Sequence, residues 1–266
     1  MNSTFSPPAL AVFDIDGVLR DVSGSYRRAL ADTVEHLTDG AFRPTPTDID
    51  RLKSEGIWNN DWEGSRELVY RYFEGQGTAR SSVEIDYNAL VAFFQSRYFG
   101  PDRSHWKGYI CHEPLLVRPE YFHNLTAAGI PWGFFSGATR DSAAFVLSER
   151  LGLVDPLLVA MEDAPGKPDP TGLLAVVAQL GDDGTIPVIY AGDTVGDLYT
   201  VQKAAQVRSD RVWIGVGILP PHVKAREDGG AAYADTLREA GARVVLANIE
   251  ELTPELIGDL RLSCIS

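Results

Sequence analysis

The chain has 266 residues, of which 44% are hydrophobic, and this supports one large α/β domain or a core with a smaller insert. Its formal net charge of -13 argues against a nucleic-acid partner, because such partners require clustered Lys and Arg. The sequence contains neither a secretory signal pattern nor an apolar run long enough to span a membrane. We therefore expect a cytoplasmic protein with no nucleic-acid or membrane partner, in an oligomeric state that the sequence leaves open.

The first predicted strand, residues 10–13, leads directly into a pair of aspartates. Its continuous apolar sequence, Leu-Ala-Val-Phe, is typical of a strand buried on both faces of a parallel sheet. Asp14 and Asp16 follow, and side chains two apart in an extended segment point the same way. Gly17 then permits a sharp turn. Ligands of open α/β sheets bind at this end of the strands, so one carboxylate is placed to attack and the other to handle protons. An ordinary Asp-Gly turn is the alternative interpretation.

The segment from about residue 22 to residue 112 has a helical pattern broken by Gly and Pro, without a clear buried strand. Its most ligand-like part is Asn59, Asn60 and Asp61, which lie between two tryptophans. These polar residues either contact a ligand or cap the helix that follows, and both interpretations stay open. For Trp62 a place in the core is the favoured interpretation.

Beyond residue 114, predicted strands and helices alternate, which is typical of a doubly wound parallel sheet. Strands are predicted over residues 132–135, 157–160 and 187–191 and near 211–216 and 243–246, with helices over 119–128, 140–151, 171–180 and 231–240. We therefore predict an α/β fold with a Rossmann-like core, residues 1–21 and 113–266, and an inserted, mostly helical cap, residues 22–112.

Polar residues follow three of the later strands. Ser136 and Gly137 precede a helix start, where a hydroxyl and free N–H groups suit a phosphate. Lys167 is held between a glycine and prolines, and Asp193 and Asp197 are hard oxygen ligands of the kind that Mg²⁺ prefers. Taken singly, each has a simpler interpretation as a helix cap or a surface charge. Because each follows a separate strand, one sheet edge would gather all of them.

Four motifs of the chain, in their order, resemble those of the haloacid dehalogenase superfamily. They are Asp14-Ile15-Asp16-Gly17, Ser136, Lys167 before Pro-Asp-Pro, and Gly192-Asp193 to Asp197. The similarity is to the superfamily's subfamily I, whose cap is inserted after the first strand, and to members like phosphoglycolate phosphatase and β-phosphoglucomutase. The resemblance implies that Asp14 is the nucleophile, which forms an aspartyl-phosphate, and that Asp16 is the general acid and then the general base.

The same resemblance implies a Mg²⁺ cofactor held by Asp14, the backbone carbonyl of Asp16 and Asp193, with Asp197 as an outer partner. Ser136 and the Gly137 amide would bind the transferring phosphoryl group, and Lys167 would balance its charge. The expected partner is a small phosphorylated metabolite, contacted by Asn59, Asn60 and Asp61 of the cap.

The function expected from the sequence is therefore a Mg²⁺-dependent phosphatase. A phosphomutase of the β-phosphoglucomutase type would share every core motif, and a catalytically silent binding or regulatory module is a further alternative. Superfamily members that cleave carbon–halogen bonds lack the second aspartate, so Asp16 argues against dehalogenation.

Overall fold

The computed structural model describes residues 7–55, 57–58, 60–102, 105–181 and 184–262. The chain divides into two compact units, Val22–Pro114 and a second unit that joins Met1–Asp21 to Leu115–Ser266. We call the first the cap unit and the second the core unit. The insert predicted from the sequence, residues 22–112, ends two residues before the cap unit does.

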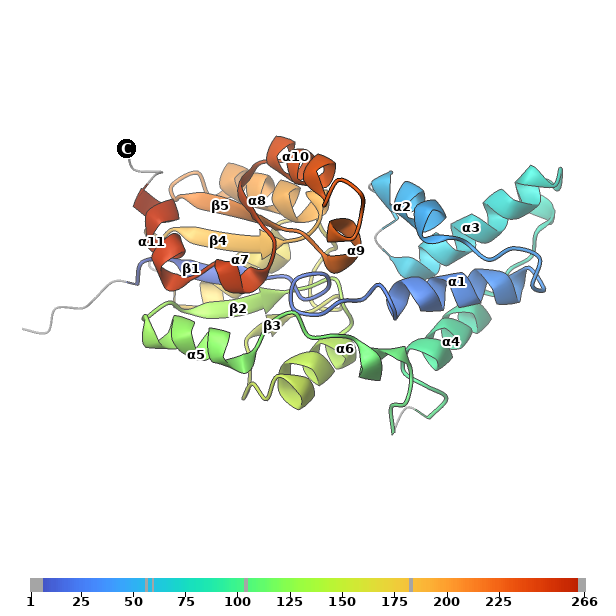
Figure 1. Ribbon diagram of the computed structural model, residues 1–266, viewed down its shortest axis with the longest axis horizontal. Helices are drawn as coiled ribbons and strands as arrows, with labels where there is room; N and C mark the ends of the chain where they lie inside the picture. The colour runs from blue at the N-terminus through green and yellow to red at the C-terminus, as the bar shows by residue number, and fades with distance from the viewer. Residues whose placement is uncertain (1–6, 56, 59, 103–104, 182–183, 263–266) are drawn as a thin grey trace, which may run out of the picture. The chain divides into compact units, whose positions relative to one another are not determined.

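The core unit is built on a six-stranded parallel sheet with the order β3-β2-β1-β4-β5-β6 (Figure 1). Its strands are β1 (Leu10–Phe13), β2 (Trp132–Phe135), β3 (Leu158–Val159), β4 (Val188–Gly192), β5 (Trp213–Ile218) and β6 (Ala242–Leu246). The chain starts at the centre of the sheet and winds outward in both directions, so the predicted α/β fold is confirmed. Phe13 pairs with Phe134 and with Ala191, which brings the ends of β1, β2 and β4 to one edge.

Helices cover both faces of this sheet. They are α5 (Pro119–Ala127), α6 (Arg140–Ala144), η3 (Phe145–Arg150), α7 (Thr171–Gln179), α8 (Val195–Val207), α9 (Pro221–Lys224), α10 (Ala231–Glu239), η4 (Ile249–Glu251) and α11 (Pro254–Leu262). The side chains of β1 alternate between two apolar clusters, because successive residues of a strand face opposite sides. Phe13 packs in one of them, edge-on to Tyr121 and Phe122 at 5.9 and 5.8 Å between ring centroids. Its truncation to Ala is expected to cost about 3–5 kcal/mol.

The helix predicted over residues 140–151 is α-helical only as far as Ala144. From Phe145 it widens to a π-helix, in which the N–H of Leu151 donates to the carbonyl of Val146 at 2.9 Å. Both forms bury Val146 and Leu147, so apolar spacing could not distinguish them. Helix α9 was not predicted, since its four residues are too few for a periodic pattern. Helix α11 was not predicted either.

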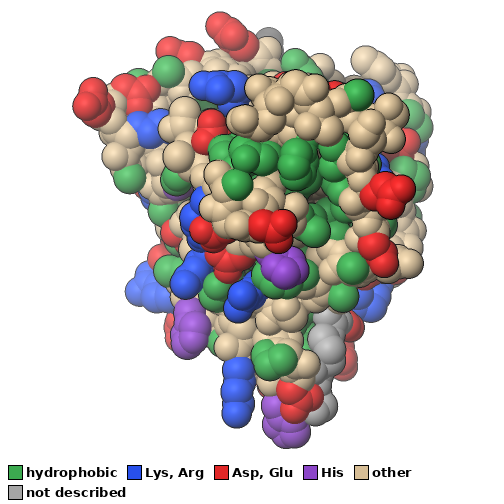
Figure 2. Space-filling model, turned by 90° about the vertical axis from the view of Figure 1, so that its right-hand side faces the viewer, with side chains coloured by type: hydrophobic (Ala, Val, Ile, Leu, Met, Phe, Trp, Pro, Cys, Tyr) green, Lys and Arg blue, Asp and Glu red, His purple; other side chains and the backbone are tan. Residues whose placement is uncertain are grey.

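The cap unit is helical throughout its regular elements. These are α1 (Tyr26–Leu37), α2 (Pro46–Ser54), α3 (Asp61–Gly75), η1 (Arg80–Ser82), α4 (Tyr87–Tyr98) and η2 (Tyr109–His112). Helix α1 packs against α3 and α4, and the rings of Tyr26 and Tyr98 stack at 4.0 Å between centroids. On the face in Figure 2, acidic and basic side chains are interspersed. Within the described ranges, no helix has both the length and the apolar character needed to cross a bilayer.

Candidate active site

The turn after β1 brings Asp14 and Asp16 to the sheet edge. The N–H of Asp14 still donates to Ala191 at 2.9 Å, as in the strand, and the chain then reverses through Gly17 at φ +76°. A Cβ on Gly17 would lie 2.1 Å from Oδ2 of Asp193. Glycine is therefore required at this position for two reasons: it tolerates a left-handed backbone, and it allows the Asp193 carboxylate to approach.

Lys167 connects two of the predicted carboxylates. Its Nζ lies 2.9 Å from Oδ1 of Asp14 and 2.5 Å from Oδ1 of Asp197, and only a tenth of the lysine side chain is exposed. Burial alone would lower the pKa of Lys167, but the charges of Asp14 and Asp197 outweigh it and raise that pKa above its usual range. The lysine is thus a fixed positive charge in the site.

Asp197 is held by donors on both of its carboxylate oxygens. Oδ2 accepts hydrogen bonds from the N–H and the hydroxyl of Thr194, at 2.9 and 2.6 Å, as part of a capping box at the start of α8. Oδ1 accepts from the Tyr190 hydroxyl at 3.0 Å and contacts Lys167. Although burial opposes it, the Lys167 charge, aided by the Thr194 donors, lowers the pKa of Asp197. With its oxygens occupied, Asp197 is suited to orient Lys167.

For Asp14 and Asp193, the other two buried acids of the site, the Lys167 charge does not outweigh the effect of burial on the pKa. Burial, reinforced by the charges of Asp197 and Asp16 and opposed by Lys167, raises the pKa of Asp14 to about 7. Burial and the neighbouring Asp197 and Asp14 raise the pKa of Asp193 well above its usual range. Among the described residues, Lys167 is the cation that contacts this group of three carboxylates, in which oxygens of Asp14, Asp193 and Asp197 all lie within 4.8 Å of one another.

This arrangement fits a divalent cation. Oδ1 of Asp14 is buried and accepts no hydrogen bond within the described part of the chain, although Lys167 lies close to it. Clustered carboxylate oxygens with excess negative charge are the ligands that Mg²⁺ binds. Of the residues predicted to hold the metal, Asp14 and Asp193 belong to this cluster together with Asp197, and Asp16 lies in the turn two residues after Asp14.

Ser136 and Gly137 follow β2, the neighbour of β1 in the sheet. Ser136 is buried, and its N–H donates to Val159 at 3.1 Å, while its Oγ accepts from the N–H of Ala138 at 3.2 Å. Gly137, the next residue, is exposed. The structure thus places Ser136 directly after β2, the strand adjacent to β1, as the predicted phosphate site requires.

In the cap unit, the predicted ligand residues already have structural partners. Asn60 caps α3, since its Oδ1 accepts from the N–H of Trp62 at 2.9 Å and of Glu63 at 3.3 Å. Asp61 forms an ion pair with Lys53 at 2.5 Å, and Trp62 is half-buried. Asn59 lies outside the described residues. Substrate contact by Asn59, Asn60 and Asp61 therefore stays a prediction.

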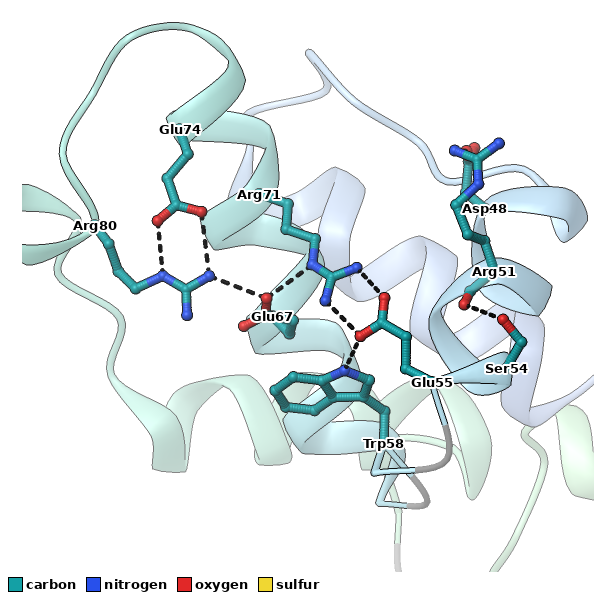
Figure 3. A network of polar contacts seen from close by, with 9 residues as sticks. All are labelled: Asp48, Arg51, Ser54, Glu55, Trp58, Glu67, Arg71, Glu74 and Arg80. Atoms are coloured by element: carbon teal, nitrogen blue, oxygen red, sulfur yellow. Dashed lines mark hydrogen bonds and ion pairs between the residues drawn. The ribbon is translucent and has the colours of Figure 1, made fainter. Parts of the chain in front are cut away.

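A polar network anchors the segment just before these residues (Figure 3). The Nε1 of Trp58 donates to Glu55 at 2.7 Å, and Glu55 accepts two hydrogen bonds from Arg71 at 2.6 and 2.8 Å. Arg71 also donates to the buried Glu67 at 2.8 Å, and Arg80 donates to the same Glu67 oxygen at 3.0 Å. Trp58 is therefore fixed to helix α3 through side chains of the cap unit itself.

Several residues that contact the acids of the core site were not predicted from the sequence. Tyr190 lies inside an apolar strand, and Tyr233 donates to the backbone carbonyl of Asp193 at 2.9 Å from a distant helix. Only Thr194 had a readable signal, the Thr-x-x-Asp spacing of a capping box. No sequence pattern indicated a role for Arg20, whose Nε donates to Oδ1 of Asp16.

The family model of haloacid dehalogenase-like hydrolases matches residues 8–204, and the chain belongs to this family. A protein of Phytophthora nicotianae named imidazoleglycerol-phosphate dehydratase is 31% identical over 247 residues, 91% of this chain and 50% of its own length. The chain therefore spans about half the length of that relative.

Solved structures share the fold. A phosphonoacetaldehyde hydrolase-like protein from Oleispira antarctica superimposes with a TM-score of 0.66 at 21% identity, covering 97% of this chain and 94% of its own. A putative β-phosphoglucomutase from Thermotoga maritima gives a TM-score of 0.58 at 18% identity, covering 97% and 100%. At these identities the similarity shows the fold and leaves the reaction to be argued from the site.

Proposed function

We propose that the protein is a Mg²⁺-dependent phosphatase that hydrolyses a small-molecule phosphomonoester through an aspartyl-phosphate on Asp14. One observation carries the proposal: the buried Asp14 carboxylate lies beside a fixed lysine and within a cluster of three acids whose negative charge that lysine only partly balances. A nucleophile that must meet a phosphate dianion needs such local cations, because the chain as a whole has a net charge of -13.

The reaction has two displacements at phosphorus. An oxygen of Asp14 attacks, the bond between phosphorus and the ester oxygen breaks, and Asp16 donates a proton to the departing oxygen. Asp16 then takes a proton from water, which attacks the phosphorus, and the bond to Asp14 breaks to release inorganic phosphate. Mg²⁺, when bound by Asp14, Asp193 and the Asp16 carbonyl, neutralises the carboxylate and phosphoryl oxygens that must approach each other.

The remaining residues hold the reacting groups in place. Lys167 favours the ionised form of Asp14, against the effect of burial, and is itself oriented by Asp197. Ser136 and the Gly137 amide bind phosphoryl oxygens from the adjacent strand. Phosphoryl transfer asks a protein mainly for positioning and charge stabilisation, and these residues supply both.

The proposed substrate is a small phosphorylated metabolite chosen by the cap unit, with Asn59, Asn60 and Asp61 as the predicted contacts. The relative from Phytophthora nicotianae is named for a reaction of imidazoleglycerol phosphate, so that ester belongs in the substrate panel. Because the relative is about twice as long, we do not assign its dehydration to this chain. Carboxylates grouped around a lysine instead favour attack at phosphorus.

The test is an assay of phosphate release by the purified protein. The panel contains p-nitrophenyl phosphate, sugar phosphates, organic-acid phosphates and imidazoleglycerol phosphate, each with Mg²⁺ and with EDTA. We expect turnover that EDTA abolishes and Mg²⁺ restores. Equal turnover without metal would contradict the mechanism, and no turnover on any ester would favour a silent binding module.

A separate assay addresses phosphomutase activity, which the same core motifs would support. The protein is incubated with hexose 1-phosphates and a catalytic amount of the bisphosphate, and products are separated. The proposal predicts free phosphate alone. Conversion to the 6-phosphate would assign the protein to the mutases instead.

A further inference from the structure

Arg20 is a fully buried arginine in the turn that carries Asp16. It is 0% exposed and stands among the largest fully buried side chains of the chain. Its backbone is fixed within the turn, since its carbonyl accepts from the N–H of Gly17 at 2.9 Å and its N–H donates to Ile15 at 3.3 Å. A guanidinium cannot shed its proton, so burial at this position requires partners of fixed geometry.

Two of those partners belong to segments that follow β1 and β2 at the site. The Nε of Arg20 donates to Oδ1 of Asp16 at 2.6 Å, and its Nη2 donates to Oγ of Ser142 at 2.9 Å. Ser142 is itself 0% exposed and lies in α6, the helix that follows Ser136 and Gly137. One rigid guanidinium therefore connects the Asp16 turn to the helix beyond the phosphate loop.

The contact restricts what Asp16 can do. More than a quarter of the Asp16 side chain is exposed, so without a partner it would sample several rotamers. Arg20 occupies Oδ1 from a buried position, which fixes the side-chain torsions and leaves Oδ2 as the oxygen to exchange a proton. A charge-assisted hydrogen bond from a planar donor restricts orientation more than a lysine would.

We propose that Arg20, anchored by Ser142, is a positioning residue that directs one oxygen of Asp16 at the leaving group. The inference rests on the proposed function, because it concerns the acid step of that reaction. It predicts a specific defect: the need for Arg20 grows as the leaving group becomes a poorer one. If Arg20 had a merely structural role, its replacement would lower kcat/KM by the same factor for all substrates.

The test compares kcat/KM for p-nitrophenyl phosphate with that for phenyl phosphate, whose phenolate leaves less readily. The parameter kcat/KM reports steps up to departure of the leaving group. For Arg20→Met we expect a loss of about 100-fold on phenyl phosphate, the usual contribution of a general acid, and under tenfold on p-nitrophenyl phosphate. Leu237→Ala, which truncates a fully buried side chain of α10, is the control for lost stability. It should lower both values equally.

Two further variants keep the test decisive if Arg20→Met does not fold. Arg20→Lys retains the charge without the planar donor pair, and Ser142→Ala removes the side chain that anchors Arg20. Both variants should increase the ratio of kcat/KM for p-nitrophenyl phosphate to kcat/KM for phenyl phosphate about tenfold. In an Asp16→Asn background none of these changes should alter that ratio, because the group being positioned is gone.

Equal losses on both substrates, or an unchanged ratio in folded Arg20→Lys and Ser142→Ala, would overturn the proposal. These outcomes require that the wild-type protein hydrolyses aryl phosphates. If the wild-type protein hydrolyses only other esters of the panel, the same comparison is made between two of those esters whose leaving groups differ. If it hydrolyses no ester of the panel, the proposed function fails, and this failure is distinct from a failure of Arg20 to position Asp16.

Discussion

Nζ of Lys167 lies 2.9 Å from Oδ1 of Asp14, and both side chains are about nine-tenths buried. The lysine comes from the loop before α7 and the aspartate from the end of β1, so the contact joins segments far apart in sequence. Lys167 thus places a positive charge beside the buried acids Asp14 and Asp197.

Replacing Lys167 with Met should affect both catalysis and stability. Loss of the charge beside the transferring phosphoryl group is expected to lower kcat by about 100- to 1,000-fold. Breaking a buried pair should also cost about 3–5 kcal/mol of unfolding free energy in EDTA, because Asp14 and Asp197 stay behind unpaired. Activity assays and urea unfolding measure the two effects. Lys203→Met, at an exposed position of α8, is the matched control and should change neither.

Gly17 offers a test of the approach of Asp193. Gly17→Ala places a methyl group 2.1 Å from the undisturbed Oδ2 of Asp193, so Mg²⁺-dependent activity should be lost. Gly129→Ala is the matched control, because Gly129 has a similar φ of +70° but nothing within 4 Å of the added Cβ. Both changes should cost about 1–2 kcal/mol for the left-handed backbone. An active Gly17→Ala protein with unaltered Mg²⁺ affinity would contradict the geometry.

Stabilisation by Mg²⁺ should grow with pH. Burial raises the pKa of Asp14 to about 7 from an ordinary 3.8, so the metal-free native state retains a proton that the unfolded state releases between those values. Over that window rising pH therefore removes stability, by up to about 1.4 kcal/mol per pH unit for one group. Acids that are paired with arginine, such as Asp163, have a lowered pKa, so rising pH adds stability as these groups titrate. The informative quantity is thus the difference with and without Mg²⁺.

The measurement is urea unfolding at pH 5 and pH 7.5, in EDTA and in saturating Mg²⁺. We expect a larger stabilisation by Mg²⁺ at pH 7.5, where the metal meets charged carboxylates. Asp193→Asn should weaken this stabilisation and shift the Mg²⁺ dependence of activity to higher concentrations. The same increment at both pH values would show that protons and metal do not compete for these acids.

Asn60 separates a structural role from substrate contact. Asn60→Ala removes the cap of α3 and should cost about 1 kcal/mol, while Asn60→Ser retains a capping oxygen and should cost less than half of that. If the side-chain amide also binds substrate, both variants should change KM or the order of substrate preference at constant metal dependence. A substrate profile unchanged in Asn60→Ser would restrict Asn60 to its capping role.

The sequence predicted the sheet edge because that edge depends on local patterns. An apolar run buried on both faces predicted β1, and the carboxylates after it follow from chain position alone. The same reasoning predicted that Ser136, Lys167 and Asp193 follow separate strands. The helices predicted over residues 119–128 and 231–240 agree with α5 and α10 to within one residue, since their apolar residues recur at helical spacing between recognisable ends.

What the sequence did not predict depends on contacts between distant segments. The Tyr190 and Tyr233 hydroxyls serve the site from positions whose patterns indicate only a strand and a helix. The burial of Arg20 against Ser142 joins residues 122 apart. The choice between capping and ligand binding at Asn60 required coordinates, because both uses call for the same short polar side chain.

The covalent role of Asp14 is the central claim, and trapping the phosphorylated protein tests it most directly. Asp16→Asn lacks the base that activates water, so after mixing with substrate and quenching in acid, mass spectrometry should find a phosphoryl group on the peptide that contains Asp14. Asp14→Asn should give no phosphorylated peptide and no turnover. Label on another residue, or turnover by Asp14→Asn near the wild-type rate, would contradict the account.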